Sequence, residues 1–201
     1  DDWEHHVEGL FEEGGGVSAI DFRHLDEGMH QFSWQVCDSK GVWSEALADS
    51  FSVVKTVLTG EMVTLTDSTY IYTSDSVFAS LTVRDKDYEL IKGYDYDIVY
   101  TGNRDAGEAN IQLIGLGAYK DTVDVAFTIH PAELTVTAES YERLEGEENP
   151  SFAFSYAGWQ GEDSDSVLTA LPVVSCDATV ESKAGTYDIV LSGGEAANYT
   201  F

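Results

Sequence analysis

The run "GYDYDIVYTGNRDAGEANIQLIGLGAY", residues 93–119, holds four acidic side chains, four tyrosines and five glycines. From residue 94 to residue 101 the tyrosines and Ile98 occupy even positions, and two aspartates occupy odd positions. This period of two is typical of a strand with one buried face. The TGNRDAG segment predicts a turn, and Ile111 and Leu113 then alternate with polar residues on a returning strand. We therefore interpret the run as a hairpin whose aspartates point outward, rather than as a reaction centre.

A related pattern occurs about 78 residues later in the chain. Two residues are inserted before its last tyrosine, and the corresponding pairs are Ala106 and Ala184, Gly107 and Gly185, Ile111 and Ile189, Leu113 and Leu191, Gly115 and Gly193, and Tyr119 and Tyr199. Self-similarity of this kind predicts two copies of one supersecondary plan, arranged as tandem modules.

The two copies differ after the last tyrosine. After Tyr119 the chain continues as an alternating strand through Val123, Val125, Phe127 and Ile129, whereas only Thr200 and Phe201 come after Tyr199. We expect the last module to lack its closing strand, which leaves an edge that invites pairing with another chain. A further strand of about ten residues is expected to raise the melting temperature of the protein.

The first part of the chain predicts three more strands and their hairpin connections. Their alternating apolar residues are Ile20 and Phe22, then Phe32, Trp34 and Val36, then Phe51 and Val53. The connections LDEGMH and DSKGVWS combine Gly with Asp or Ser, which is typical of hairpin turns. We expect Trp34 and Trp43 to fill the core of a small module here, since Trp34 shares its register with apolar neighbours.

These patterns predict an all-β protein of three small tandem modules of the Ig-like β-sandwich type. The modules span residues 1–56, 57–131 and 132–201, and the second boundary falls where Pro131 removes a backbone donor. The segment 162–171 offers one helical turn before Pro172, with Ser or Asp as its cap. The third module is therefore either a sandwich or a β-grasp sheet with one short helix.

Composition and charge exclude several classes of partner. The chain is 43% hydrophobic and 12% aromatic, which is typical of a folded protein. Thirty-seven acidic residues stand against ten Lys and Arg residues, for a net charge of −27, and such a field repels nucleic acid and anionic membranes. No apolar run is long enough to span a bilayer, so we expect no membrane insertion by this segment. We expect the acidic residues on its surface to keep the protein soluble.

The chain from residue 132 to residue 201 resembles the MBG type of bacterial Ig-like or β-grasp-like repeat. The resemblance rests on Gly146-Glu147-Glu148-Asn149-Pro150-Ser151-Phe152, Ser155-Tyr156-Ala157-Gly158-Trp159, Ser166-Val167-Leu168-Thr169, Pro172, Ala184-Gly185-Thr186-Tyr187-Asp188-Ile189, Ser192-Gly193-Gly194 and Asn198-Tyr199-Thr200-Phe201. It departs from the repeat at Glu145, where tyrosine is usual before the glycine, and at the final strand.

The other two modules are similar to repeats of large surface proteins. Residues 61–130 resemble a second such repeat through Leu90, Gly93-Tyr94-Asp95-Tyr96, Tyr100, Asn103, Gly107, Gly115-Leu116-Gly117-Ala118-Tyr119 and Phe127-Thr128-Ile129. Residues 20–54 are similar to short Ig-like units through Gly28-Met29-His30, Asp38-Ser39-Lys40-Gly41 and Trp43-Ser44. These resemblances imply an extracellular, architectural role and supply no catalytic residues.

Calcium is the one metal that the acidic loops suggest. Asp85 with Asp87, and Asp163 with Asp165, lie in short loops that could offer hard oxygen ligands, although neither loop has the EF-hand pattern. A solvated turn is the competing interpretation of each loop. Adjacent histidines His5 and His6 point to opposite faces of an extended segment and do not indicate a metal site.

Catalytic and ligand-binding motifs are sparse. Cys37 and Cys176 stand beside acidic residues, which disfavours a reactive thiolate, and we expect both to be free thiols, Cys176 in the core. No cofactor is expected. Trp159 comes after Gly158 and precedes a polar run, so it either packs under that loop or is exposed for a ligand.

These observations are compatible with two functional hypotheses. The first is a non-enzymatic stalk or adhesion segment of a secreted or cell-surface bacterial protein. The second is a binding module for a glycan or a protein on a host or cell surface, which could be attached to a carbohydrate-active enzyme. Self-association through an edge strand is compatible with either one.

Overall fold

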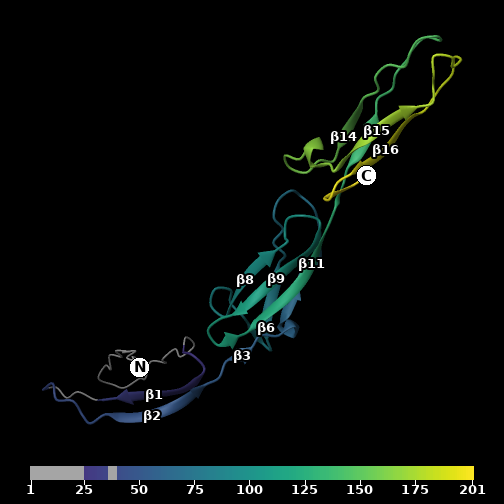
Figure 1. Ribbon diagram of the computed structural model, residues 1–201. Helices are drawn as coiled ribbons and strands as arrows, with labels where there is room; N and C mark the ends of the chain where they lie inside the picture. Colours follow the sequence, from purple (N-terminus) through teal and green to yellow (C-terminus); the bar gives the residue numbers. More distant parts are fainter. Residues whose placement is uncertain (1–24, 36–39) are drawn as a thin grey trace.

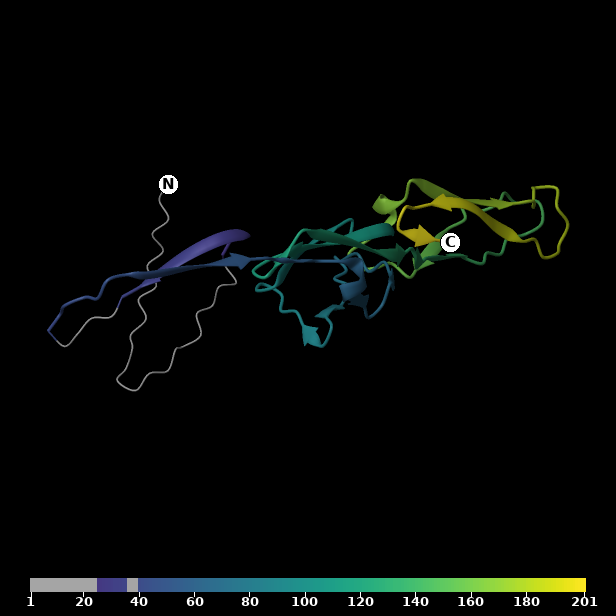
Figure 2. The same ribbon diagram turned by 90° about the horizontal axis from the view of Figure 1, so that it is seen from below.

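The computed structural model describes residues 25–35 and 40–201, and these residues confirm the all-β class. They form seventeen strands and two single turns of 3-10 helix. The strands gather in three groups that succeed one another along an elongated molecule (Figures 1 and 2). We call these groups the N-terminal ribbon (β1 and β2), the middle unit (β3 to β11) and the C-terminal unit (β12 to β17).

The N-terminal ribbon consists of β1 (Gly28–Trp34) and β2 (Leu47–Val53), which pair antiparallel from Gly28 opposite Val53 to Trp34 opposite Leu47. A two-stranded ribbon has no second layer to cover its apolar side chains. The expectation that Trp43 fills a core here is wrong, because 63% of this residue is exposed. Phe32 is also exposed, so the described part of residues 1–56 forms a ribbon and not a sandwich.

Several expectations for the first module lie outside the described residues. These are the strand at Ile20 and Phe22, the histidines His5 and His6, the placement of Val36 and Cys37, and the packing of the Trp34 side chain.

The middle unit contains a four-stranded sheet in the order β5-β11-β9-β8, a three-stranded sheet in the order β4-β6-β7 and a short parallel pair of β3 and β10. The strands are β3 (Thr56–Val57), β4 (Val63–Leu65), β5 (Thr69–Ile71), β6 (Leu81–Asp85), β7 (Tyr88–Glu89), β8 (Tyr96–Thr101), β9 (Gly107–Gly115), β10 (Tyr119–Lys120) and β11 (Thr122–His130). One turn of 3-10 helix, η1 (Gly60–Met62), precedes β4.

The hairpin expected from residues 93–119 is confirmed as β8 and β9. Tyr96 is buried and Ile98 and Tyr100 are partly buried, whereas Asp97 and Val99 are exposed. On β9, Ile111 and Leu113 are fully buried. Alternation therefore places one face of this sheet in the core, and β11 covers the inner edge of β9 along eight residue pairs.

Asp95 departs from the expectation that the aspartates of this hairpin point outward. It lies in the turn before β8, only 2% of the residue is exposed, and Oδ2 accepts hydrogen bonds from the Ile91 N–H (2.9 Å) and the Tyr88 hydroxyl (3.1 Å). Its backbone oxygen accepts a third bond, from the Leu116 N–H. The strand period does not extend through this turn, so the parity that places Asp97 outside does not apply to Asp95.

Replacing Asp95 by alanine is expected to lower the free energy of unfolding by about 1–3 kcal/mol, because it leaves the Ile91 N–H and the Tyr88 hydroxyl without their acceptor. Urea denaturation followed by tryptophan fluorescence measures this change. Asp67→Ala removes an exposed carboxylate from the same unit and is the matched control, with an expected change within about 0.5 kcal/mol. Equal effects of the two substitutions would contradict a structural role for Asp95.

The C-terminal unit is built from three two-stranded pairs. These are the parallel pair of β12 (Ala132–Glu133) and β17 (Tyr199–Thr200), and the antiparallel pairs of β13 (Thr135–Ala138) with β14 (Phe154–Ala157) and of β15 (Ala170–Cys176) with β16 (Ile189–Glu195). The expected helical turn is the 3-10 turn η2 (Asp165–Val167), which begins after Ser164 without a side-chain cap. No α-helix crosses a sheet in the residues that the structure describes.

The strand registers of the two copies agree at several of the matched positions. Leu113 pairs with Ile98, and Leu191 pairs with Val174. In each copy a glycine lies two residues after the leucine, at Gly115 or Gly193, and pairs with a residue of the same neighbouring strand. The tyrosine strand of each repeat then runs parallel to the strand that enters the same unit. Tyr119 pairs with Thr56 and Tyr199 pairs with Ala132.

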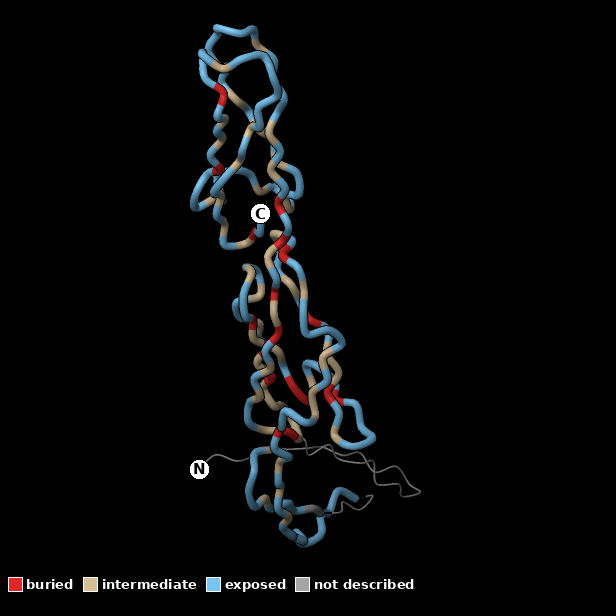
Figure 3. The backbone as a smooth tube through the Cα atoms, turned by 90° about the vertical axis from the view of Figure 1, so that its right-hand side faces the viewer, coloured by how far each residue is buried: buried red, intermediate tan, exposed pale blue. Residues whose placement is uncertain are grey.

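The apolar core is continuous from the middle unit into the C-terminal unit. Buried Phe127 and Ile129 of β11 belong to the same cluster as Leu134 and Tyr199. Buried segments are frequent along the middle unit, while most of the C-terminal unit is exposed or partly exposed (Figure 3).

Candidate functional site

The contact between the middle and C-terminal units is the most densely connected polar region between two groups of strands. We call it the junction and define it by Tyr72, Asp105 and Ala106 on the middle unit and by Asp163, Asn198 and Tyr199 on the C-terminal unit. Tyr72 comes directly after β5, Asn198 directly precedes β17, and Tyr199 is the first residue of β17. Between the two units the backbone passes only through Pro131, which separates β11 from β12.

Asp163 joins the two units through a single carboxylate oxygen. Its Oδ2 accepts a hydrogen bond from the Tyr72 hydroxyl (2.9 Å) and another from the Tyr199 hydroxyl (2.6 Å). Both tyrosines are almost completely buried. Hydrogen bonds to an ionised acceptor are stronger than those between neutral groups, so this arrangement holds three side chains from two units in one geometry.

Asn198 makes a second connection across the junction. Its Oδ1 accepts a hydrogen bond from the Ala106 N–H (2.8 Å), and its Nδ2 donates to Asp105 Oδ1 (3.0 Å). The backbone oxygen of Asn198 also accepts from the Ala132 N–H at the start of β12. One residue, through its side chain and its backbone oxygen, therefore connects the loop before β9 with the strand that begins the C-terminal unit.

Aromatic rings fill the space beneath these hydrogen bonds. The rings of Tyr72 and Tyr199 meet edge to face with centroids 5.6 Å apart, and Trp159 meets Tyr199 in the same way at 5.2 Å. Gly161 lies so close to Ser74 that an added Cβ would overlap the Ser74 hydroxyl. The loop 158–165 can approach the middle unit this closely because Gly161 has a positive φ of 54° and no side chain.

Burial controls the ionisation of the junction tyrosines. Burial, and next to it the hydrogen bond to the Asp163 carboxylate, raises the pKa of Tyr199 to about 12, and the same two causes raise the pKa of Tyr72. Burial and the nearby Asp85 carboxylate also raise the pKa of Tyr119 to about 12. These hydroxyls therefore stay protonated and act as hydrogen-bond donors at neutral pH.

These pKa shifts predict that alkaline pH weakens the junction. The folded-state pKa of Tyr199 lies above the ordinary tyrosine value near 10, so its contribution is complete below pH 10 and is lost as the pH rises through about 12. We expect the melting temperature to be constant between pH 8 and 9 and to fall between pH 10 and 12. In the Tyr199→Phe variant the fall should be smaller, and an identical pH profile would exclude Tyr199 as a source.

The structure places the residues that suggested calcium in two separate loops. Asp85 and Asp87 lie at the turn between β6 and β7, and Asp163 and Asp165 lie beside η2. Among the described residues no three His, Cys, Asp or Glu side chains are arranged to hold a metal ion. Asp163 instead uses its carboxylate to accept tyrosine hydroxyls. Calcium binding stays a prediction.

The two loops correspond to each other within the repeat. The Tyr119 hydroxyl donates to Asp85 Oδ2 over a longer distance of 3.4 Å, as Tyr199 donates to Asp163. Asp85 and Asp163 are 78 residues apart, which is the spacing of the repeat. The local sequence pattern predicts both acids only as loop residues. Their shared spacing is the sign that each acid accepts a hydrogen bond from the tyrosine of its own repeat.

Trp159 is partly buried and packs between two tyrosines. Its ring lies 5.1 Å from that of Tyr156 and 5.2 Å from that of Tyr199. Cys176 is a free, partly buried thiol that faces Ile189 on the neighbouring strand. A ligand-binding role of Trp159 stays a prediction.

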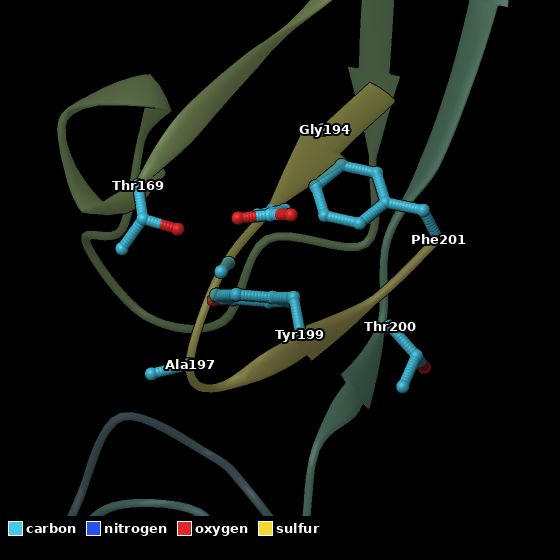
Figure 4. A pocket seen from close by; sticks show the side chains of 8 residues that line it. Thr169, Gly194, Ala197, Tyr199, Thr200 and Phe201 are labelled. Atoms are coloured by element: carbon cyan, nitrogen blue, oxygen red, sulfur yellow. The ribbon is translucent and has the colours of Figure 1, made fainter. Parts of the chain in front are cut away.

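An open hollow lies beside the last strand of the chain (Figure 4). Its lining residues are Thr169, Gly194, Glu195, Ala196, Ala197, Tyr199, Thr200 and Phe201. Among these residues Glu195 is the one acid, and the walls carry no other titratable group except the Tyr199 hydroxyl. This set does not provide the pair of carboxylates that a glycosidase requires.

One segment at the end of the described residues is similar to a known family model. Residues 134–201 match the MBG domain (YGX type). This match supports the MBG-type repeat expected for the third module, and such repeats are a non-catalytic type found in surface proteins. No curated protein and no solved structure matches the chain. In the described part, no helix has the length and apolar character required to cross a membrane.

Proposed function

We propose that this chain is a non-enzymatic spacer segment of a secreted or cell-surface bacterial protein. The observation that carries the proposal is the junction, which joins two units end to end through hydrogen bonds and a shared apolar core. A chain of units with fixed joints transmits position and force over its length. The MBG-type match at residues 134–201 supports placement in a surface protein.

We further propose three consecutive units, at residues 1–56, 57–131 and 132–201. The connections between them are short, since β2 ends at Val53 and β3 begins at Thr56, and Pro131 alone separates β11 from β12. Thr56 pairs with Tyr119, so this residue belongs with the middle unit and the first boundary falls just before it. A surface ion pair between Lys120 and Glu27 (2.8 Å) also connects the middle unit with the segment before β1. An exposed ion pair contributes little stability, so we assign the rigid joint to the junction and not to this contact.

Small-angle X-ray scattering of the 201-residue protein tests this proposal. We expect a distance distribution typical of an elongated particle, with a maximum dimension that is the same in low salt and in about 0.5 M salt. Screening would shorten a string of units that only charge repulsion keeps extended, because the Debye length falls to a few Å near 1 M salt. A compact particle, or a strongly salt-dependent dimension, would overturn the spacer function.

Exposed tryptophan favours a second candidate, a binding module for a glycan or for a protein on a host or cell surface. Trp43 lies on the loop that connects β1 and β2 and is mostly exposed, and an exposed indole ring is suited to stacking on a sugar. Such a module could be accessory to a carbohydrate-active enzyme. Tryptophan fluorescence during titration with a glycan library tests it, with Trp43→Ala and Trp159→Phe as separate variants. The spacer function alone predicts no saturable change.

A further inference from the structure

Tension along the chain enters the middle unit at β3 and leaves it at the end of β11. The backbone reaches this unit through Lys55 and Thr56, and it leaves through Pro131. β11 extends from the middle unit toward the C-terminal unit (Figure 1). A pull on the two ends of the molecule therefore draws β3 and β11 in opposite directions.

The strand β10 connects these two points directly. It pairs parallel with β3, with Tyr119 opposite Thr56, and β11 begins two residues after β10 ends. The Thr56 N–H donates to the Ala118 oxygen (2.9 Å), and the Leu58 N–H donates to the Lys120 oxygen (3.0 Å). Leu58 is 4% exposed, so its side chain also holds the end of β3 in the core.

The parallel direction of this pair determines how load acts on its hydrogen bonds. In a parallel pair, the beginning of one strand and the end of the other lie at opposite ends of the ladder. A pull on the beginning of β3 and on the end of β10 therefore slides the strands past each other and loads both hydrogen bonds together. The same pull on an antiparallel pair would open its hydrogen bonds one at a time.

The side chain of Glu27 supports the same pair of strands. Its carboxylate accepts a hydrogen bond from the Lys55 N–H (2.9 Å), directly before β3, and others from Lys120 Nζ of β10 (2.9 Å and 2.8 Å). One carboxylate therefore contacts both strands. Because these groups are exposed, they contribute less than the backbone hydrogen bonds.

The C-terminal unit repeats this arrangement where the chain enters it. β12 pairs parallel with β17, and two N–H groups of the entering strand donate to the residues on either side of Tyr199, as those of β3 donate on either side of Tyr119. The bonded pairs are Ala132 with Asn198 and Leu134 with Thr200. Leu134 is buried, as Leu58 is. Both units therefore have the same two hydrogen bonds at their entrance.

We propose that the pair of β3 and β10 is a mechanical clamp, which carries tension past the rest of the middle unit and determines how long that unit stays closed under load. This inference rests on the proposed spacer function, because a spacer transmits a pull between its two ends. While the clamp holds, load passes from β3 to β10 and β11, and residues 59–118 do not extend. Forced unfolding is governed by the unfolding rate, so the bonds that break first determine the lifetime of the closed unit.

Optical tweezers test the clamp in the full 201-residue protein, with Cys37 and Cys176 replaced by serine. Handles are attached through the substitutions Val54→Cys and His130→Cys, at two exposed positions on either side of the loaded segment. The readout is the time from application of a fixed force to the first extension of the unit.

Thr56→Pro removes the N–H that donates to Ala118. We expect it to shorten this lifetime about threefold to tenfold, which is the effect of losing one backbone hydrogen bond. Val57→Pro is the matched control, because the Val57 N–H lies between the two donors of β3 and faces away from β10. Its lifetime should stay within about twofold of the parent. If Thr56→Pro does not fold, an ester in place of the amide at residue 56 removes the same N–H without the proline ring, and an ester at residue 57 is its control.

A second pulling direction separates the clamp from a general loss of stability. Handles at Asp67→Cys and His130→Cys lead the load into β11 through β5, which pairs with β11 from Thr128 to His130, and bypass β3. In this direction Thr56→Pro should change the lifetime by no more than about twofold. Equal lifetimes of the two proline variants with handles at Val54 and His130, or equal shortening by Thr56→Pro in both directions, overturns the clamp. Small-angle scattering decides the spacer function separately, since an elongated shape does not depend on which bonds carry tension.

Discussion

Replacing Phe127 by alanine is expected to lower the free energy of unfolding by about 3–5 kcal/mol, which is typical of a buried phenylalanine whose cavity cannot close. Phe127 is 2% exposed, lies opposite Ala109 in the register of β11 and β9, and meets the ring of Tyr70 edge to face at 5.6 Å. β11 is central in its sheet, so its neighbours on both sides limit relaxation into the cavity. A domain of this size has a total free energy of unfolding of only about 5–15 kcal/mol, so this loss removes a large part of its stability.

Urea denaturation measures this effect, with Phe78→Ala as the matched control. Phe78 is a phenylalanine of the same unit that is 66% exposed, and it contacts Tyr100 edge to face. Truncation of Phe78 removes that contact but leaves no closed cavity, so we expect a loss of no more than about 1 kcal/mol. Similar losses from the two substitutions would show that the core is not centred on β11.

The second large effect is expected from Gly158→Ala. Gly158 comes after β14 with a φ of 111°, and a Cβ at this position would overlap the backbone oxygen of Glu133 in β12. An L side chain at such a φ costs on the order of 1–3 kcal/mol by itself. The overlap adds to this cost, since the obstacle is backbone and β12 is held by its pairing with β17.

Gly146→Ala separates the two causes. Gly146 also has a positive φ, of 89°, but nothing lies within 4 Å of its added Cβ. The control therefore carries the backbone cost without the overlap, and Gly158→Ala should lose clearly more stability. Trp159 is the next residue, so tryptophan fluorescence reports the change locally during denaturation. Equal losses would mean that β12 can move away from residue 158 without cost.

Much of the fold is determined by local pattern. The alternation in residues 94–101 predicts the buried face of β8, and the shared glycine and tyrosine positions predict that two units have the same strand plan. The first prediction results from the two-residue period of a strand, which is a property of the backbone and does not depend on distant residues. The second rests on the similarity between two parts of the sequence. The boundary at Pro131 and the helical turn before Pro172 are also predicted locally, because proline acts on its immediate neighbours.

Features that depend on distant residues could not be predicted in this way. The Tyr72 hydroxyl meets the Asp163 carboxylate across 91 positions of sequence, and no local pattern links a tyrosine after β5 with an acid beside η2. Asp95 is buried because a turn, rather than a strand, determines its direction. Trp43 is exposed because a core depends on a second layer of strands, and the described ribbon has none.

The sequence does not predict the junction itself. It indicates the acidic loops with Asp85 and Asp163 only as candidate calcium ligands or solvated turns, whereas in the structure each of these acids accepts a tyrosine hydroxyl. The sequence does not predict that a tyrosine hydroxyl is the partner of each acid, because a tyrosine on a strand is interpreted as a core residue whatever its hydroxyl contacts. The spacing of 78 residues relates the two acids to each other once it is applied to polar as well as apolar positions.

We expect the junction to hold the middle and C-terminal units in one fixed arrangement. The direct measurement is a pulsed electron paramagnetic resonance distance between spin labels at Val99 and Val173, two exposed strand positions on either side, with Cys37 and Cys176 replaced by serine. We predict a single narrow distance distribution, which broadens in the double variant Asp163→Ala with Asn198→Ala. A broad distribution without those two substitutions, or a narrow one that they do not change, would show that the junction does not fix the two units.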